Sequence, residues 1–264
     1  MEQLVLLIII GAIAGVMSGM FGIGGGAIIV PALMIFLGFE QTLANGTSLA
    51  ALLLPVGIFA AIDYYRNKKL RLAPALIVAL GLTAATWFGA SLALDLPRDT
   101  LRQSYGVLLV YMAWRYVAPR QWWKEIRGIS VQKVIEDAEI NPISPRVLFV
   151  CLLIGLVAGI FSGLFGIGGG VVIVPALMAF LAFDQKLATG TSLGALLLPV
   201  GLPGVLRYGQ VGQVDLAIAA PLAIMLMLGA IIGARVTLSL PTKTVRRLYG
   251  FFLLFVGLRF LFTP

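Results

Sequence analysis

A short cluster of glycines occurs twice in the chain, and it interrupts any helix that runs into it. The first copy reads Phe-Gly-Ile-Gly-Gly-Gly over residues 21–26, and residues 165–170 repeat it. Glycine has no Cβ, so it adopts left-handed backbone conformations and leaves its N–H accessible. An apolar run follows each cluster. This pattern predicts a helix whose N-terminus carries partial positive charge and free N–H donors.

The duplication covers nearly the whole chain, because other stretches recur at the same offset of 144 residues (166 − 22). Residues 46–57, Gly-Thr-Ser-Leu-Ala-Ala-Leu-Leu-Leu-Pro-Val-Gly, return as residues 190–201 with a single change, from Ala50 to Gly194. The sequence therefore predicts two homologous repeats, at residues 1–118 and 147–264.

The composition is that of a membrane protein. Of the 264 residues, 60% are hydrophobic and 11% are charged, whereas a soluble domain has about 25% charged residues. We therefore expect an all-α polytopic protein in a lipid bilayer. Its net charge of +8 suits basic residues in cytoplasmic loops and does not require nucleic acid as a partner.

Ten apolar segments, five in each repeat, are delimited by charged and turn residues. They are Leu4–Met20, Ala27–Phe39, Thr42–Ile62, Leu72–Leu94, Leu101–Val117, Val147–Leu164, Val171–Phe183, Leu187–Leu206, Leu216–Leu238 and Leu248–Phe262. The second segment of each repeat has 13 residues and would rise about 20 Å as a helix, less than the roughly 30 Å hydrocarbon core. We expect short or broken helices at the glycine-rich motifs.

A polar stretch, residues 119–146, separates the repeats. Trp122 and Trp123 stand beside basic residues, which is typical of a helix lying at the membrane interface. We expect this stretch to be a cytoplasmic linker that contains an interfacial helix.

The distribution of basic residues favours an inverted relation between the repeats. Five segments per repeat would place 15 of the 19 Lys and Arg residues on one side and 4 on the other. Four segments per repeat, which would make the copies parallel, gives 12 and 7. By the positive-inside rule we prefer inversion, with both termini outside and the linker in the cytoplasm.

In an inverted arrangement the two glycine clusters enter from opposite faces and converge near the membrane midplane, where repeat-built transporters bind substrate. Their N–H donors favour a small anion, although glycines that only allow close helix packing are the alternative. The predicted backbone cradle comprises Gly22, Gly24, Gly25 and Gly26 with Gly166, Gly168, Gly169 and Gly170.

Hydroxyl and amide side chains follow each cluster, and we expect them to donate hydrogen bonds to the substrate. The alternative is that they cap helix N-termini. These residues are Asn45, Thr47 and Ser48 in the first repeat and Thr189, Thr191 and Ser192 in the second.

Four further residues are candidates for gating or kinking. Pro55 and Pro199 stand inside apolar segments and should kink or break them. Asp63 and Arg207 occupy equivalent positions with opposite charge, so they could pair or gate a path; ordinary interfacial residues at helix ends are the alternative.

No enzymatic site is apparent. The chain has no histidine and one cysteine, Cys151, so it offers no Ser-His-Asp or Cys-His arrangement and no Cys/His metal site. No Walker sequence is present, and the glycine cluster lacks the acidic residue and βαβ context of a dinucleotide site. We expect no cofactor and no metal.

The doubled Phe-Gly-Ile-Gly-Gly-Gly, each copy followed by Val-Pro-Ala-Leu and then Gly-Thr-Ser-Leu, resembles the sulfite exporter TauE/SafE family along the whole chain. This group of membrane permeases includes 4-toluene sulfonate uptake proteins. The resemblance implies transport of sulfite, sulfonates or other small anions across the bacterial cytoplasmic (inner) membrane by a multi-pass protein.

Together these observations predict a secondary transporter of a small anion, most simply sulfite or an organosulfonate. A passive anion channel and an organic-anion (carboxylate) permease are the alternatives. A homodimer stays open, as do the direction of transport and the coupling ion.

Overall fold

The computed structural model describes residues 2–117, 144–239 and 242–262. It contains two compact units: unit 1 is Met1–Asp95 with Glu139–Ser239, and unit 2 is Leu96–Ala138 with Leu240–Pro264. Each unit takes residues from both halves of the sequence. The division into repeats at 1–118 and 147–264 therefore does not describe separate folding units and stays a prediction about sequence relationship. The predicted interfacial helix of the linker lies outside the described residues.

Unit 1 is helical throughout, with no strand among its described residues. Its helices are α1 (Glu2–Phe21), α2 (Gly26–Phe36), α3 (Gln41–Ala51), α4 (Ile58–Arg66), α5 (Leu72–Asp95), α8 (Pro145–Phe165), α9 (Gly170–Phe180), α10 (Gln185–Ala195), α11 (Leu202–Gly209) and α12 (Leu216–Ser239).

The glycine clusters separate α1 from α2 and α8 from α9, as the sequence predicts. The segments Thr42–Ile62 and Leu187–Leu206 are each two helices rather than one. Pro55 and Pro199 lie in the breaks, where the missing proline N–H and the bulk of the ring stop the preceding helix.

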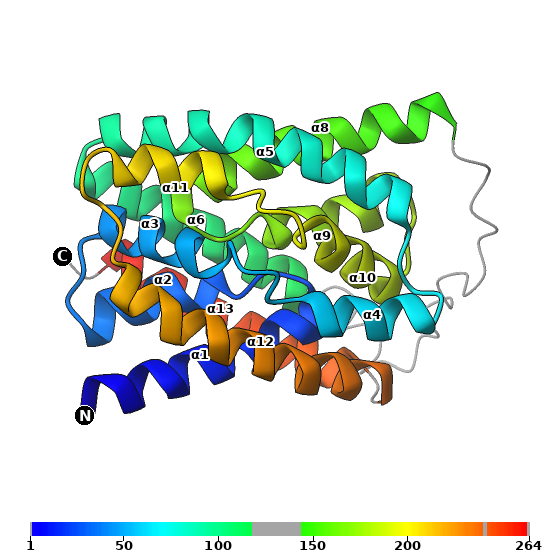
Figure 1. The fold of residues 1–264 in the computed structure, drawn as a ribbon, viewed down its shortest axis with the longest axis horizontal. Helices are drawn as coiled ribbons and strands as arrows, with labels where there is room; N and C mark the ends of the chain where they lie inside the picture. Colours follow the sequence, from blue (N-terminus) through cyan, green and yellow to red (C-terminus); the bar gives the residue numbers. More distant parts are fainter. Residues whose placement is uncertain (1, 118–143, 240–241, 263–264) are drawn as a thin grey trace. The chain divides into compact units, whose positions relative to one another are not determined.

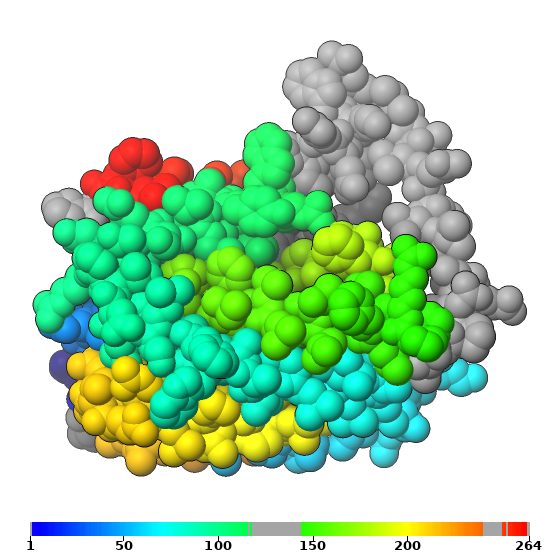
Figure 2. Space-filling view, turned by 90° about the horizontal axis from the view of Figure 1, so that it is seen from above, coloured from blue at the N-terminus to red at the C-terminus, as the bar shows by residue number. Residues whose placement is uncertain are grey.

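Four helices, α1, α5, α8 and α12, are long and apolar enough to cross a membrane. Their outward side chains are apolar: Leu76, Leu80 and Phe88 of α5 and Phe149 and Leu153 of α8 are all exposed. Figure 2 shows one such face, with α5 in cyan to teal beside α8 in green and α11 in yellow. A broad apolar surface of this kind is the surface of a membrane protein.

The long helices pack as two parallel pairs through small residues. A Cβ added at Gly11, Gly15 or Gly19 of α1 would meet the backbone or Cβ atoms of α12 at successive turns. Gly155, Gly159 and Gly163, which are the equivalents in α8, approach α5 in the same way. Glycines spaced four residues apart let two helix backbones touch, which is the usual device for packing helices in lipid.

The two pairs run in opposite directions. In Figure 1, α1 runs from left to right, whereas α8 starts at the right and runs to the left. As a result, the chain enters the glycine loop after α1 and the glycine loop after α8 from opposite directions.

Unit 2 consists of α6 (Arg98–Val117) and α13 (Thr242–Phe262), which pack against each other. They are antiparallel, because Gly106 lies against Gly257 while Gly250 lies against Val117. Tyr105 meets the ring of Phe260 edge to face at 5.5 Å.

Gly15 tests the close packing of α1 on α12. A Cβ there would lie 2.5 Å from the carbonyl oxygen of Leu226, whereas nothing lies within 4 Å of a Cβ at Gly209. We expect Gly15→Ala to destabilise the protein by about 1–3 kcal/mol through overpacking, and Gly209→Ala to leave it as stable or slightly more so. Thermal unfolding of the detergent-purified variants measures the difference; equal midpoints would contradict this packing.

Candidate functional site

The two glycine loops meet each other at the centre of unit 1. A Cβ at Gly26 would clash with the Gly166 carbonyl, and one at Gly170 with the Gly22 carbonyl. The loops adopt the left-handed conformations that the sequence predicts, with φ of +80° at Gly24 and +86° at Gly25. Any side chain at these positions would strain the backbone, so both glycine clusters are required for the fold itself.

Several N–H groups of the glycine loops are unengaged. Those of Gly24, Gly25 and Gly26, and those of their equivalents Gly168, Gly169 and Gly170, form no hydrogen bond to any residue that the structure describes. A backbone N–H without a partner in a dry environment costs free energy. A ligand with acceptor atoms would recover that cost by accepting hydrogen bonds from these donors.

The polar side chains of α3 and α10 donate hydrogen bonds to carbonyls in and beside the glycine loops. The Ser48 hydroxyl donates to the Gly166 carbonyl at 2.8 Å, and the Ser192 hydroxyl donates to the Gly22 carbonyl at 2.7 Å. Asn45 donates to the Leu164 carbonyl at 2.9 Å, and Thr189 donates to a carbonyl at the end of α1. Each half of the chain therefore fixes the glycine loop of the other half.

Thr47 and Thr191 hold the turns that lead into the long helices. The Thr47 hydroxyl accepts a hydrogen bond from the Asp215 N–H at 3.0 Å, and the Thr191 hydroxyl accepts one from the Arg71 N–H at 3.3 Å. These threonines and their polar neighbours lie in mid-helix and are buried. Helix capping, which was the alternative for this group, is thus wrong. In this conformation the hydroxyls and the Asn45 amide nitrogen serve the backbone.

Four helices begin at the centre of unit 1, and all four have glycine at the N-cap. Gly25, Gly57, Gly169 and Gly201 precede α2, α4, α9 and α11, and none of these N-termini has a side-chain cap. By contrast, Ser144 and Asp184 cap α8 and α10. Glycine caps leave the helix starts open to a negatively charged group.

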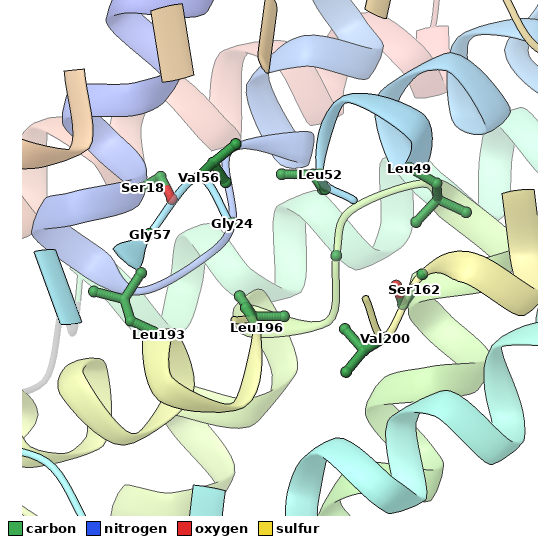
Figure 3. Close-up of a pocket in the computed structure, with 12 residues that line it drawn as sticks. Ser18, Gly24, Leu49, Leu52, Val56, Gly57, Ser162, Leu193, Leu196 and Val200 are labelled. Carbon is green, nitrogen blue, oxygen red and sulfur yellow. The ribbon is translucent and has the colours of Figure 1, made fainter. Parts of the chain in front are cut away.

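A small cavity lies between the glycine loops and the two helix breaks (Figure 3). Its lining consists of six pairs of identical residues, each pair separated by 144 positions: Ser18 and Ser162, Gly24 and Gly168, Leu49 and Leu193, Leu52 and Leu196, Val56 and Val200, Gly57 and Gly201. The volume open to the centre of a water molecule is about 10 Å³, which is room for about one water. The cavity is therefore too small for an oxyanion in this conformation.

Ser18 and Ser162 are polar residues of this cavity that the sequence analysis missed. Both are buried, and neither hydroxyl has a hydrogen-bond partner among the described residues. A hydroxyl in an apolar helix ordinarily donates to the carbonyl four residues back, as Thr83 and Thr86 do. Figure 3 places Ser18 beside Val56 and Ser162 beside Val200, on opposite sides of the pocket.

A signal for these serines was present in the sequence. Each stands three residues before its glycine cluster, and both copies have serine there. A hydroxyl retained in both copies of an otherwise apolar run was a reason to include it among the candidate donors.

Asp63 and Arg207 do not pair with each other. The Asp63 carboxylate lies 3.7 Å from the Arg235 Nε, and the Arg207 Nε donates to the Ser91 hydroxyl at 3.0 Å. Arg235 and Ser91 are themselves equivalent positions (235 − 91 = 144). Each short helix after a break is thus tied to a long helix, α4 to α12 and α11 to α5, by chemically different contacts at the two ends.

No metal cluster is found among the described residues, which contain no group of three or more His, Cys, Asp or Glu side chains. Cys151 is buried in α8, outside the cavity lining.

Ser48 and Ser192 distinguish a structural role from a substrate-donor role. Replacing either by Ala leaves a buried glycine carbonyl without its hydroxyl partner, so we expect a loss of about 1–3 kcal/mol of stability. Ser239→Ala, which removes an exposed hydroxyl bonded within its own helix, should have little effect. Unfolding of ligand-free protein is the measurement. Unchanged stability of Ser48→Ala with weakened anion binding would contradict the structural role.

Comparison with known proteins gives one family. The family model described as Sulfite exporter TauE/SafE matches residues 7–260. Probable membrane transporter protein YunE of Bacillus subtilis (strain 168) is 26% identical, over 98% of this chain and 97% of its own length. Probable membrane transporter protein MJ0441 of Methanocaldococcus jannaschii is 28% identical, over 96% of this chain and 93% of its own length.

No solved structure matches the chain. The match to the family covers almost all of the sequence, including both glycine loops and the whole cavity lining. The chain therefore belongs to the sulfite exporter TauE/SafE family of membrane transporters.

Proposed function

We propose that this protein is a secondary transporter that carries a small anion, sulfite or an organosulfonate, across the bacterial cytoplasmic membrane. The observation that carries the proposal is the central cavity, whose six identical pairs of residues include glycine caps of helix starts and hydroxyls without partners. Helix N-termini and hydroxyl donors suit an anion. The family's description names sulfite, which agrees with that chemistry.

The proposed binding site is the glycine cradle at the membrane midplane. Its donors are the N–H groups from Gly24 to Gly26 and from Gly168 to Gly170, supplemented by the hydroxyls of Ser18 and Ser162; the N–H groups of Gly22 and Gly166 donate instead to the Ser18 and Ser162 carbonyls. The polar residues of α3 and α10 hold these loops in place through hydrogen bonds to backbone carbonyls.

The proposed topology is two inverted repeats of five segments. Three observations support it: helix bounds that recur at an offset of 144, the opposite directions of α1 and α8 (Figure 1), and the distribution of charge in unit 1. One end of unit 1, joined by the contacts of Lys69 with Asp184 and of Lys186 with Leu238, has Arg66, Lys68, Lys69, Arg71, Arg146, Lys186 and Arg235. By the positive-inside rule this end is cytoplasmic.

The proposed mechanism is alternating access. The breaks at Pro55 and Pro199 allow α4 and α11 to move independently of α3 and α10, and Asp63 and Arg207 tie these short helices to their long neighbours. Releasing one tie opens the cavity toward one side, and releasing the other opens it toward the other side. The present conformation, with room for about one water, corresponds to an occluded state.

Val56 tests the location of the site. Val56→Phe would fill the cavity, whereas Leu54→Phe adds the same ring to an exposed position in the same break. Sulfite or methanesulfonate should raise the unfolding temperature of the wild type and of Leu54→Phe, because a ligand that binds only the folded state stabilises it. Val56→Phe should show no shift. An undiminished shift in a folded Val56→Phe variant would place binding elsewhere.

Counterflow in proteoliposomes separates a carrier from a channel. Vesicles preloaded with unlabelled sulfite should accumulate labelled sulfite transiently, because a carrier exchanges the two across the membrane. Flux that rises linearly with concentration and shows no counterflow would identify a passive channel. Counterflow by carboxylates and not by sulfite or sulfonates would identify an organic-anion permease.

A further inference from the structure

We propose that the central cavity selects singly charged oxyanions, which it holds between the hydroxyls of Ser18 and Ser162, and excludes doubly charged ones. This inference rests on the proposed transport function and specifies the charge state of its substrate. Bisulfite and alkanesulfonates belong to the selected class, whereas sulfate and fully ionised sulfite belong to the excluded class.

The cavity offers two hydroxyl groups as hydrogen-bond donors. Two buried hydroxyls that have no hydrogen-bond partner in the described part of the chain face one cavity from opposite sides. Leaving a buried hydroxyl unsatisfied destabilises the protein, and the same cost recurs at equivalent positions of both halves. A ligand whose acceptor oxygens reach both hydroxyls would satisfy them, and a hydroxyl bonded to an anion is among the stronger hydrogen bonds. A sulfonate or bisulfite group has such oxygens.

The charges around the cavity determine the net charge of the ligand that it accepts. None of the twelve lining residues is ionisable. Positive potential comes from the starts of α2, α4, α9 and α11, each equivalent to about half an elementary charge. The C-terminal ends of α1, α3, α8 and α10 adjoin the same loops and breaks, and their partial negative charges offset much of that potential.

Desolvation then separates the two classes of anion. The cost of removing an ion from water rises with the square of its charge, so a dianion loses about four times the hydration free energy of a monoanion of the same size. A cavity without a lysine or arginine offers no positive charge to compensate the second negative charge of a dianion. The apolar walls formed by Leu52, Leu196, Val56 and Val200 also suit the uncharged side of the ligand, such as a methyl group.

The protein itself lacks the side chain that ordinarily titrates near neutral pH, because the chain contains no histidine. The ionisable side chains on the helices of unit 1 are Glu2, Asp63, Tyr64, Tyr65, Arg66, Asp95, Arg146, Cys151, Lys186, Arg207, Tyr208 and Arg235, and none of them lines the cavity. Tyr64 and Tyr208 do not line it, and their hydroxyls donate to the carbonyls of Gly19 and Gly163. A pH response of binding therefore reports the ligand.

Titration calorimetry on the purified full-length protein tests the inference. Methanesulfonate, which stays singly charged, should bind with the same affinity on both sides of neutral pH. Sulfite, which takes up its first proton near neutral pH, should bind about tenfold more weakly for each pH unit above that proton's pKa, as bisulfite disappears. Sulfate should not bind.

Serine variants test the assignment of the donors. Ser18→Ala and Ser162→Ala should each weaken methanesulfonate binding by about tenfold or more, the usual effect of losing a hydrogen bond to a charged group. The ligand-free variants should be as stable as the wild type or more stable, because each loses an unsatisfied hydroxyl. Ser239→Ala, an exposed position, is the matched control and should change neither property.

Three results would overturn the inference in distinguishable ways. Sulfite affinity that is constant or rises with pH, or sulfate binding comparable to methanesulfonate binding, would refute the charge selection and leave the proposed transport function standing. Unchanged affinity in the double Ser18→Ala, Ser162→Ala variant would refute the donors. Binding of no anion by the folded wild type would refute the proposed function together with the inference.

Discussion

The buried carbonyl oxygens at the ends of α1 and α8 are the constraint on which the rest of this structure depends. A helix that stops inside an apolar environment leaves carbonyls that water cannot reach. Here Ser48, Asn45, Ser192 and Thr189 supply the partners, and each comes from the other half of the chain. These reciprocal hydrogen bonds hold the two halves of the chain together and fix the position of both glycine loops. The N–H groups of Gly24, Gly25 and Gly26 and of their equivalents at 168–170, which have no partner among the described residues, can then serve a ligand.

Much of the fold could be predicted from the sequence, because glycine and proline act locally. The clusters at residues 21–26 and 165–170 break helices through their own backbone freedom, and Pro55 and Pro199 do so through their rings. The partners of Asn45 and Ser48 could not be predicted, because they lie 119 and 118 residues away. When that contact is not known, a hydroxyl in an apolar segment is equally consistent with a structural hydrogen bond and with a hydrogen bond to a ligand. Ser18 was missed because a single serine in an apolar run carries no local signal, and the signal that it does carry, its recurrence as Ser162, becomes visible only when the two copies are compared.

The two halves are identical where they line the cavity and different at the contacts that tie α4 and α11 to the long helices. Every lining residue recurs unchanged, so both halves present the same chemistry to the cavity. At the ties, however, Asp63 binds Arg235 whereas Arg207 binds Ser91. An ion pair and a hydrogen bond from arginine to a neutral hydroxyl differ in strength and in their response to salt. In the proposed mechanism, binding is therefore symmetric, and any preference between inward and outward opening arises at the ties.

The central claim is that the anion lies between the two glycine loops, and its most direct test is to locate a bound anion. Selenite has the shape of sulfite, and its selenium can be found by anomalous X-ray scattering in crystals of the complex. The account predicts one strong peak between Gly24 and Gly168, with oxygens within hydrogen-bonding distance of the Ser18 and Ser162 hydroxyls. A peak only at the basic end of unit 1, beside residues such as Arg66 and Lys68, would contradict it.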